Sequence, residues 1–333
     1  MDLGYMKPNK LIYHPDRVKQ YLETGDPDPI SVKLYLTERC NLACDYCVYK
    51  DRITGRDMSQ DDFEFIMGSL AMMGVRALVL TGGEPTMHPY FHEMVQYAYN
   101  RYGFDIGLIT NGVEFQHIKY LTWIRFSVDA IHDYSYKKIK GKNYLQKVLD
   151  NVDLAIEEKK ILGLDTTIGV QMVVTPENYL QISDFIGYFD ETGVDYIQIR
   201  PLENARYKDD EMERIMHALI AEKTRDRKSS VILTEYKWDE LANNYQKSYP
   251  GCPGAKFIGA VGVNGDMHIC CTWMKHGSAY YGNLIKDRPP EILKNRSVVL
   301  KQFDYSKCPV GCQASLINKF LVEIRKIKHR NFI

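Results

Sequence analysis

The stretch Leu36-Thr37-Glu38-Arg39-Cys40-Asn41-Leu42-Ala43-Cys44-Asp45-Tyr46-Cys47 carries three cysteines in a C-x3-C-x2-C pattern, directly after an apolar, strand-like run. A loop this short can turn three sulfurs toward one place. Structural zinc takes four protein ligands, and a [4Fe–4S] cluster is ordinarily held by four cysteines. A three-cysteine cluster would leave one iron open to an exogenous ligand. The alternatives are a zinc site with a borrowed fourth ligand, or a disulfide with one free thiol.

The composition is that of an ordinary globular chain. The 333 residues carry a formal net charge of zero, which argues against a bulk polyanionic partner. No apolar run approaches the ~20 residues that a membrane span requires. The N-terminal residues 1–5 lack the layout of a signal peptide. We therefore expect a cytoplasmic protein without a membrane partner, in which clustered cysteines are more often metal ligands than disulfides.

From Ser31 onward the sequence predicts strands alternating with helices. The predicted strands cover residues 31–36, 75–80, 105–109, 121–128, 166–174 and 195–199. The predicted helices between them cover residues 59–73, 89–102, 144–162 and 180–192. This alternation favours a parallel α/β sheet whose right-handed crossovers curl it into a full or partial barrel. Functional residues in such folds follow the carboxyl ends of the strands.

Polar motifs do follow the predicted strands. Gly82-Gly83-Glu84-Pro85 comes after the second strand, Asn111 after the third, Ser127 at the end of the fourth and Arg200 after the sixth. Adjacent glycines let the backbone approach a ligand closely, and no phosphate-binding glycine fingerprint occurs here. Asn111-Gly112 is equally a plain turn signal, and Arg200 could equally form a structural ion pair.

The eight cysteines fall into two groups, and the second lies near the C-terminus: Cys252, Cys270, Cys271, Cys308 and Cys312. Residues 256–270 predict a β-hairpin with its turn at residues 264–266. The hairpin would bring Cys270 back beside Cys252, and a later loop would add Cys308 and Cys312. Four converging cysteines predict either structural zinc or a fully ligated iron–sulfur cluster, and their spacing does not separate the two.

Cys271 is left over from this set. Neighbours on a strand point to opposite faces, so Cys270 and Cys271 are not expected to bind the same cluster. Cys271 is then either a small buried apolar side chain or a thiol that faces a reaction site.

The domain layout follows from these patterns. We expect a cover segment over residues 1–30, the partial barrel over 31–203, and a helical connector over 204–250 with a helix at 210–224. A small α+β unit with the hairpin would span residues 251–315, and a basic helix residues 316–333. That helix predicts a solvated face or a lid. Contact with phosphate in a nucleotide sugar or a nucleic acid is the alternative.

The cysteine loop, with aromatic Tyr46 before its last cysteine, and the Gly-Gly-Glu-Pro run resemble the signature of the radical S-adenosylmethionine (SAM) superfamily. The resemblance implies that Cys40, Cys44 and Cys47 hold a [4Fe–4S] cluster whose fourth iron is chelated by SAM. It also implies that the other SAM contacts come from Tyr46, Gly82, Gly83, Glu84, Pro85, Asn111, Ser127 and Arg200. Reductive cleavage of SAM would give a 5′-deoxyadenosyl radical that abstracts hydrogen from a substrate C–H bond.

The second cysteine group, with Gly282-Asn283-Leu284 after its hairpin, resembles the Twitch domain, a shortened relative of the SPASM domain. The resemblance implies that Cys252, Cys270, Cys308 and Cys312 hold an auxiliary [4Fe–4S] cluster, although the closing C-x3-C departs from the common C-x2-C. Together the resemblances cover residues 31–201 and 252–312. They predict a partial (β/α)6 radical SAM barrel with a small C-terminal α+β Twitch domain.

Two fates of a substrate radical are compatible with these residues. Loss of an electron would give dehydrogenation, and hydrogen return from Cys271, as in some Twitch-type epimerases, would give epimerisation. We expect an oxidoreductase or isomerase acting on a small polar, sugar-like or nucleotide-linked substrate, with a flavodoxin- or ferredoxin-type electron donor. The alternatives are a peptide- or nucleic-acid-modifying radical SAM enzyme and a non-catalytic metal-binding protein.

Overall fold

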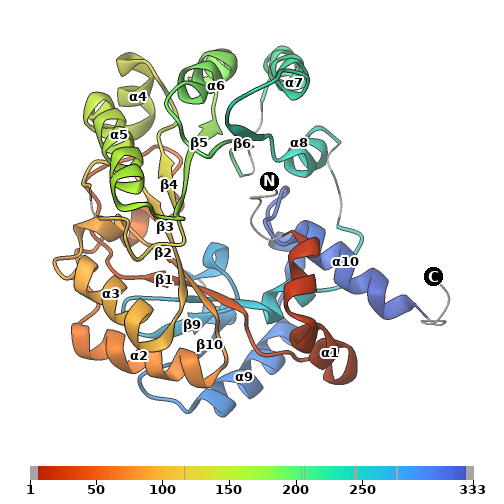
Figure 1. The fold of residues 1–333 in the computed structure, drawn as a ribbon. Coiled ribbons are helices and arrows are strands. Elements are labelled where there is room, and N and C mark those ends of the chain that lie inside the picture. Colours follow the sequence, from red (N-terminus) through yellow and green to blue (C-terminus); the bar gives the residue numbers. More distant parts are fainter. Residues whose placement is uncertain are drawn as a thin grey trace.

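The computed structural model describes residues 7–115, 117–203, 205, 207–243, 245, 247–274 and 277–327. Its centre is one ten-stranded sheet with the order β10-β9-β8-β1-β2-β3-β4-β5-β6-β7 (Figure 1). The strands are β1 Ser31–Tyr35, β2 Ala77–Thr81, β3 Asp105–Thr110, β4 Trp123–Ser127, β5 Thr167–Val174, β6 Tyr196–Pro201, β7 Ser230–Ile232, β8 Ile258–Val261, β9 Asp266–His268 and β10 Tyr280–Asn283. Strands β1 to β7 pair in parallel, and the sequence predicts this for the first six of them.

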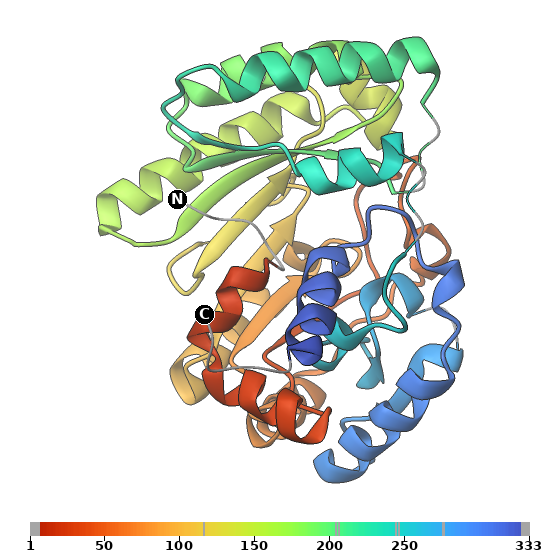
Figure 2. The same cartoon turned by 90° about the vertical axis from the view of Figure 1, so that its right-hand side faces the viewer.

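The helices are α1 Pro15–Thr24, α2 Gln60–Met72, α3 Phe91–Tyr102, α4 Asp133–Lys140, α5 Leu145–Leu162, α6 Ile182–Asp190, α7 Asp209–Lys223, α8 Glu235–Ala242, α9 Pro289–Gln302 and α10 Ser315–Lys326. Helices α2 to α7 cover the convex side of the curved sheet, whereas α1, α8 and α10 lie at its open side (Figures 1 and 2). The predicted cap of α2 is present, because the Ser59 hydroxyl accepts a hydrogen bond from the Asp62 amide at 3.1 Å. No helix in the described ranges is long and apolar enough to cross a membrane.

Two aromatic side chains form a floor on the inner face of the sheet. A Cβ atom on Gly107 would lie 2.1 Å from the Trp123 ring of the neighbouring strand. A Cβ atom on Gly169 would likewise lie 2.1 Å from the Tyr196 ring. The two glycines therefore make room for large rings that close the interior below the carboxyl ends of the strands.

The segment predicted as a helical connector contains more than helices. The helix predicted over residues 210–224 is present as α7, but Ser230–Ile232 adds a seventh parallel strand beside β6. A strand of three residues is too short to give a periodic signal, so the sequence pattern missed it. It also missed α4, whose lysine-rich sequence has only a short apolar face.

The C-terminal hairpin is present, and it joins the barrel sheet. β8 and β9 pair antiparallel around the predicted turn, where the Gly262 amide donates to the Asp266 carbonyl at 2.9 Å. On its other edge β8 pairs in parallel with β1. Buried Asn283 holds β10 to the turn, because its Nδ2 donates to the Asp266 Oδ1 at 2.8 Å and the Asn264 carbonyl at 2.9 Å. The predicted C-terminal helix is present as α10, and the last basic positions, 328 and 330, lie outside the described residues.

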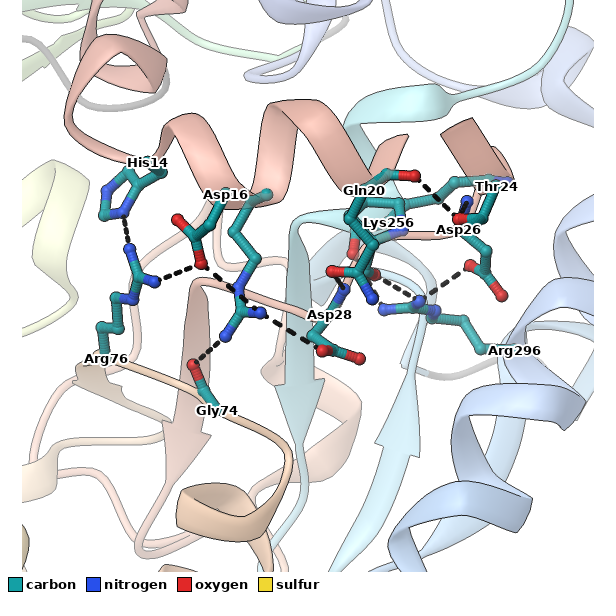
Figure 3. A network of polar contacts seen from close by, with 12 residues as sticks. His14, Asp16, Gln20, Thr24, Asp26, Asp28, Gly74, Arg76, Lys256 and Arg296 are labelled. Carbon is teal, nitrogen blue, oxygen red and sulfur yellow. Dashed lines mark hydrogen bonds and ion pairs between the residues drawn. The ribbon is translucent and has the colours of Figure 1, made fainter. Parts of the chain in front are cut away.

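A polar network fastens α1 to the amino-terminal edge of the sheet (Figure 3). Arg76 precedes β2 and contacts His14 Nδ1 and Asp16 Oδ2, each at 2.6 Å. Arg296 of α9 donates to Asp26 at 2.8 Å and to the backbone carbonyls of Pro27 and Lys256 at 2.7 and 2.8 Å. Helix α1 also lies beside α10, where Tyr21 and Leu321 share a small apolar cluster (Figure 2). The N-terminal segment thus closes the end of the barrel opposite the cysteine loop.

Arg296 is the most buried charge of this network, with a side chain only 1% exposed. We predict that Arg296→Met destabilises the fold by roughly 2 to 4 kcal/mol, because two buried carbonyls and a carboxylate lose their donor. Urea denaturation followed by circular dichroism measures this change. The exposed Lys294 on the same helix provides the control, and Lys294→Met should stay within about 0.5 kcal/mol of wild type. Equal effects of the two substitutions would contradict a structural role of the network.

Candidate active site

One cavity of about 900 Å³ lies at the carboxyl ends of the parallel strands and extends down to the aromatic floor. It brings together most of the residues that the sequence singled out. Those that line it are Cys40, Cys44, Tyr46, Cys47, Gly82, Gly83, Glu84, Asn111, Ser127, Arg200 and Cys271. Pro85 is buried behind the lining. The cavity is therefore the candidate active site.

The cysteine loop is held against the glycine motif by backbone contacts. The amide of Gly83 donates to the Thr37 carbonyl at 3.0 Å, and the amide of Glu84 donates to the Arg39 carbonyl at 2.7 Å. A Cβ atom on Gly83 would lie 2.1 Å from the Arg39 carbonyl oxygen. Glycine is thus required here for the close approach of two loops, in addition to any approach to a ligand.

Glu84 joins the loops that follow β2 and β3. Its carboxylate is buried, and Oε1 accepts hydrogen bonds from the hydroxyls of Thr86 and Thr110 at 2.7 Å. Oε2 accepts from the Asn111 amide at 2.6 Å. Burial raises the pKa of Glu84, and these hydrogen bonds oppose the rise. Oε2 accepts one such bond and has capacity for another, so the contact of Glu84 with SAM that the family resemblance implies remains a prediction.

A buried ion pair that the sequence analysis did not identify lies directly beneath Tyr46. Lys140 and Asp129 are 1% and 0% exposed and form a close ion pair. Lys140 Nζ also donates to the Ser127 carbonyl at 2.7 Å, and the Tyr46 hydroxyl donates to Asp129. The loop continues this contact, because the Ala43 amide donates to the Lys140 carbonyl at 3.0 Å. In the sequence, the charged residue Asp129 follows directly after an apolar strand, and this position was the available signal for the ion pair.

Polar side chains on the inner strand faces form the remaining wall. Gln198 accepts a hydrogen bond from Arg125 Nη1 at 2.8 Å. Gln171 Oε1 is buried and has no hydrogen-bond partner among the described residues. A buried acceptor without a donor is costly, so Gln171 fits a ligand hydroxyl or amine in the cavity. The sequence analysis did not identify two further lining residues, Lys33 and Arg125. Each is a charged residue within an otherwise apolar strand, and this position could have indicated a site residue.

The four cysteines predicted to bind an auxiliary cluster lie outside the cavity lining. Burial raises the pKa of Cys252 and of Cys312, the latter to about 12, and neighbouring thiols raise them further. Two N–H groups point at sulfur: Asn318 Nδ2 lies 3.3 Å from Cys252 Sγ, and Trp273 Nε1 lies 3.3 Å from Cys308 Sγ. Such donors stabilise thiolate ligands of a cluster.

Cys271 differs from these four because it lines the cavity, although its thiol interacts electrostatically with that of Cys270. The Cys271 Sγ accepts hydrogen bonds from Lys33 Nζ at 3.2 Å and from Gln313 Nε2 at 3.5 Å. Its backbone carbonyl accepts from the Tyr49 hydroxyl at 3.5 Å, which links it to the cysteine loop. Cys271 is half-buried, and besides these polar partners it packs against the apolar cluster of Tyr35, Ala260, Val263 and Met274.

Residues 34–188 match the family model described as the Radical SAM superfamily. The chain contains a radical SAM domain. The superfamily binds a [4Fe–4S] cluster and SAM, and the cavity lining holds the matching cysteines and glycine motif. The radical SAM domain includes the strands β1 to β5 and the cysteine loop.

Curated relatives match over about half of this chain. A probable GTP 3′,8-cyclase of Methanococcus maripaludis is 29% identical over 194 residues, which are 52% of this chain and 65% of that protein. A GTP 3′,8-cyclase of Lactiplantibacillus plantarum is 30% identical over 190 residues, which are 52% of this chain and 55% of that protein. The chain thus spans less than two thirds of the length of these relatives.

Solved structures share the fold over more of the chain. Streptococcus suis SuiB matches with a TM-score of 0.69 and 14% identity, covering 96% of this chain and 79% of SuiB. A structure described as native anSMEcpe with bound AdoMet matches with a TM-score of 0.61 and 17% identity, covering 82% and 83% of the two chains. At these identities the likeness concerns the fold alone.

The thiol chemistry of both cysteine groups is compatible with a [4Fe–4S] cluster. Among the described residues, no three His, Cys, Asp or Glu side chains are gathered closely enough to hold one metal ion. A [4Fe–4S] cluster binds each cysteine through a separate iron, so its thiolates need not meet at one point. Burial raises the pKa of Cys44 to about 11, and the thiols of Cys40 and Cys47 add to this rise. Cluster irons would relieve this repulsion by binding the thiolates.

Iron content tests the two ligand sets. We predict about eight irons per chain in the anaerobically reconstituted wild type and about four in either Cys44→Ala or Cys270→Ala, because each substitution removes a ligand of one cluster. The neighbouring Cys271→Ala is the matched control and should keep about eight. Iron and acid-labile sulfide assays, with zinc measured in the same samples, give the answer. Zinc in place of iron after Cys44→Ala would contradict the auxiliary cluster.

The close approach at Gly83 gives a second prediction. Gly83→Ala should weaken SAM binding by about tenfold or more, because the added methyl group must push the cysteine loop away from the glycine motif. A methyl group at Gly187 would meet no atom within 4 Å, so Gly187→Ala serves as the control and should bind SAM normally. Equilibrium dialysis with labelled SAM measures both. Unchanged binding in Gly83→Ala would show that the loop contact is not needed.

Proposed function

We propose that this radical SAM protein epimerises a small polar substrate, sugar-like or nucleotide-linked, and that Cys271 donates the returning hydrogen atom. The observation that carries the proposal is the position of the Cys271 thiol. It lines the same cavity as Cys40, Cys44 and Cys47, yet it is contributed by a different element, the turn after β9. A substrate bound in this cavity can therefore face the first cysteine group on one side and the Cys271 thiol on another.

The residues that would hold the cofactors are those of the cavity rim. Cys40, Cys44 and Cys47 would bind the first cluster, and the glycine motif, Asn111 and Ser127 would hold SAM against it. When bound, the cluster and SAM supply a 5′-deoxyadenosyl radical that takes one hydrogen atom from a substrate C–H bond. Gln171, with its unsatisfied acceptor, would orient a hydroxyl or amine of the bound molecule.

Cys271 then completes the reaction on the substrate. Its S–H bond breaks, a new C–H bond forms at the radical carbon, and the unpaired electron moves to sulfur. This direction is favourable because an S–H bond is weaker than most C–H bonds. One electron from a flavodoxin- or ferredoxin-type donor and one proton from solvent restore the thiol. Lys33, hydrogen-bonded to the sulfur at 3.2 Å, is placed to deliver that proton. Each turnover consumes two electrons in all, one for SAM cleavage and one for the thiol.

The second cysteine group is proposed to hold an auxiliary [4Fe–4S] cluster. Cys252, Cys270, Cys308 and Cys312 would use all four irons, so this cluster would have no open position for substrate. The N–H donors from Asn318 and Trp273 support this assignment. An oxidative role for the cluster would give dehydrogenation instead of epimerisation, and the test below separates the two.

Two observations support the proposed substrate class: the chemistry of the cavity lining and the name of the matched relatives. The polar and cationic inner wall suits a hydroxylated or charged small molecule in about 900 Å³. The name GTP 3′,8-cyclase of the matched relatives supports a nucleotide-linked substrate. One SuiB structure is described as bound to a precursor peptide, which supports the peptide alternative. We favour the small molecule, because the cationic inner wall and the name of the matched relatives both support it.

Solvent deuterium tests the role of Cys271. Wild type, Cys271→Ala and Cys271→Ser are reconstituted anaerobically and given SAM, reductant and candidate nucleotide sugars in deuterated water. We expect one deuterium in the wild-type product and none in either variant, because neither a methyl group nor a serine hydroxyl donates hydrogen readily to a carbon radical. Formation of 5′-deoxyadenosine should persist in both variants.

An oxidised product without deuterium, formed equally by wild type and Cys271→Ala, would contradict the epimerase and assign a dehydrogenase. Turnover of peptides but of no nucleotide sugar would move the substrate to the peptide class. Absence of 5′-deoxyadenosine in the fully iron-loaded wild type would contradict the enzyme itself.

A further inference from the structure

One wall of the cavity is rich in cations. The lining contains six Lys and Arg side chains and three Glu side chains. Arg200 from the end of β6 and Lys237 from α8 meet at this wall, and Lys237 is also in electrostatic contact with Lys33 of β1. Strands β1 and β6 are far apart in the sheet, so the curvature of the barrel and the position of α8 bring these charges together.

The carboxylates near this wall leave Arg200 and Lys237 incompletely paired. Glu203 Oε1 lies 3.6 Å from Arg200 Nη2 and 3.8 Å from Lys237 Nζ, so one carboxylate is shared by two cations beyond hydrogen-bond distance. Glu235, also in the lining, forms an ion pair with Lys223 at 3.1 Å. The Glu84 carboxylate accepts hydrogen bonds from the loops after β2 and β3.

Lys237 is the most informative of these side chains. It is only 7% exposed, although it lines the cavity. Among the described residues, no hydrogen-bond acceptor of its ammonium group is found, and Glu203 at 3.8 Å is its ion-pair partner. The Lys237 side chain thus reaches a cavity in which its carboxylate partner lies beyond hydrogen-bond distance. An anion bound in the cavity would supply the acceptors that its ammonium group lacks.

The first turn of α8 lies in the same wall. Thr234, Glu235, Tyr236 and Lys237 all line the cavity. The Thr234 hydroxyl donates to the Ile199 carbonyl at 2.8 Å and does not cap the helix. The Lys237 amide donates to the Thr234 carbonyl at 2.9 Å, so the amides of Glu235 and Tyr236 are the ones that an anion can meet. The positive end of the helix dipole adds to the attraction of Arg200 and Lys237 for an anion.

We propose that Arg200, Lys237 and the first turn of α8 bind a phosphate group of the substrate, either a phosphate ester or a diphosphate. Donors from three directions match a tetrahedral group with three free oxygens, whereas a planar carboxylate is satisfied by one arginine alone. The inference rests on the proposed function in placing the substrate in this cavity, and it narrows the substrate to phosphorylated molecules. Arg200 is thereby assigned to the substrate and not to SAM.

The cations could instead balance the charge of the proposed auxiliary cluster, because Lys237 is also in electrostatic contact with Cys312. Lys247 separates these two explanations. It donates to the backbone carbonyl of Cys308, and it does not line the cavity. A lysine that serves only the cluster should behave like Lys247 in a phosphate-binding experiment.

The experiment is calorimetric titration of the iron-loaded, anaerobic protein with inorganic phosphate, pyrophosphate and malonate, in the absence of SAM and reductant. We expect saturable binding of phosphate or pyrophosphate in wild type, weakened about tenfold or more by Arg200→Gln and by Lys237→Met. Glu203→Gln should strengthen the binding of phosphate or pyrophosphate several-fold, which is about the effect of one surface charge interaction. The reason is that the substitution removes a carboxylate that repels the anion. Lys247→Gln should leave this binding unchanged. If pyrophosphate binds more tightly than phosphate, the substrate is assigned a diphosphate group. If phosphate binds more tightly, the substrate is assigned a phosphate ester.

Wild-type binding that is absent, or that Arg200→Gln and Lys237→Met leave unchanged at equal iron content, would overturn the proposal. Tighter binding of malonate than of either phosphate probe would also overturn it, in favour of a carboxylate. The measurement requires no turnover, so failure of the Cys271 experiment would leave this result intact, and failure here would leave the role of Cys271 intact.

Discussion

The buried ion pair between Lys140 and Asp129 is the interaction on which the active-site rim depends. Both side chains are almost fully withdrawn from water, which is costly unless every polar atom is satisfied. Asp129 meets this condition through Lys140, the Tyr46 hydroxyl and the Val173 amide, the last at 2.6 Å. Its own backbone adopts a φ of 68°, and Asn178 holds its carbonyl at 2.6 Å. The ends of strands β4 and β5, helix α4 and the cysteine loop are therefore all held at Asp129.

The parallel arrangement of the strands determines where the active site can lie. Parallel strands present all their carboxyl ends at one edge, so loops distant in sequence meet there. The glycine motif is fixed to the cysteine loop by the close approach at Gly83, and Glu84 fixes the next loop in turn. Below them the rings of Trp123 and Tyr196 close the interior. Cys271, Arg200 and Lys237 line the same cavity.

The two cysteine groups are mechanically connected. Strand β8 pairs with β1, and β1 leads directly into the cysteine loop, so the hairpin module extends the barrel sheet. The turn that follows β9 brings Cys271 to the cavity, while Cys270 remains with the second group. The hydrogen bond from Tyr49 to the Cys271 carbonyl completes the connection. A displacement of the hairpin would therefore alter the cavity wall as well as the second cysteine group.

The sequence by itself determined the parallel α/β fold and the hairpin, because strand and helix periods and an Asn-Gly turn are local patterns. It predicted different directions for Cys270 and Cys271 from strand alternation, but β9 ends at His268 and Cys271 begins a 3-10 helix, so the tertiary structure decided which of the two lines the cavity. Only the tertiary structure joined β8 to β1, placed the polar partners of Cys271 and paired Lys140 with Asp129. It also brought Arg200 and Lys237 together across the open side of the barrel. These contacts depend on sheet curvature and on packing between segments far apart in the chain, which no local pattern records.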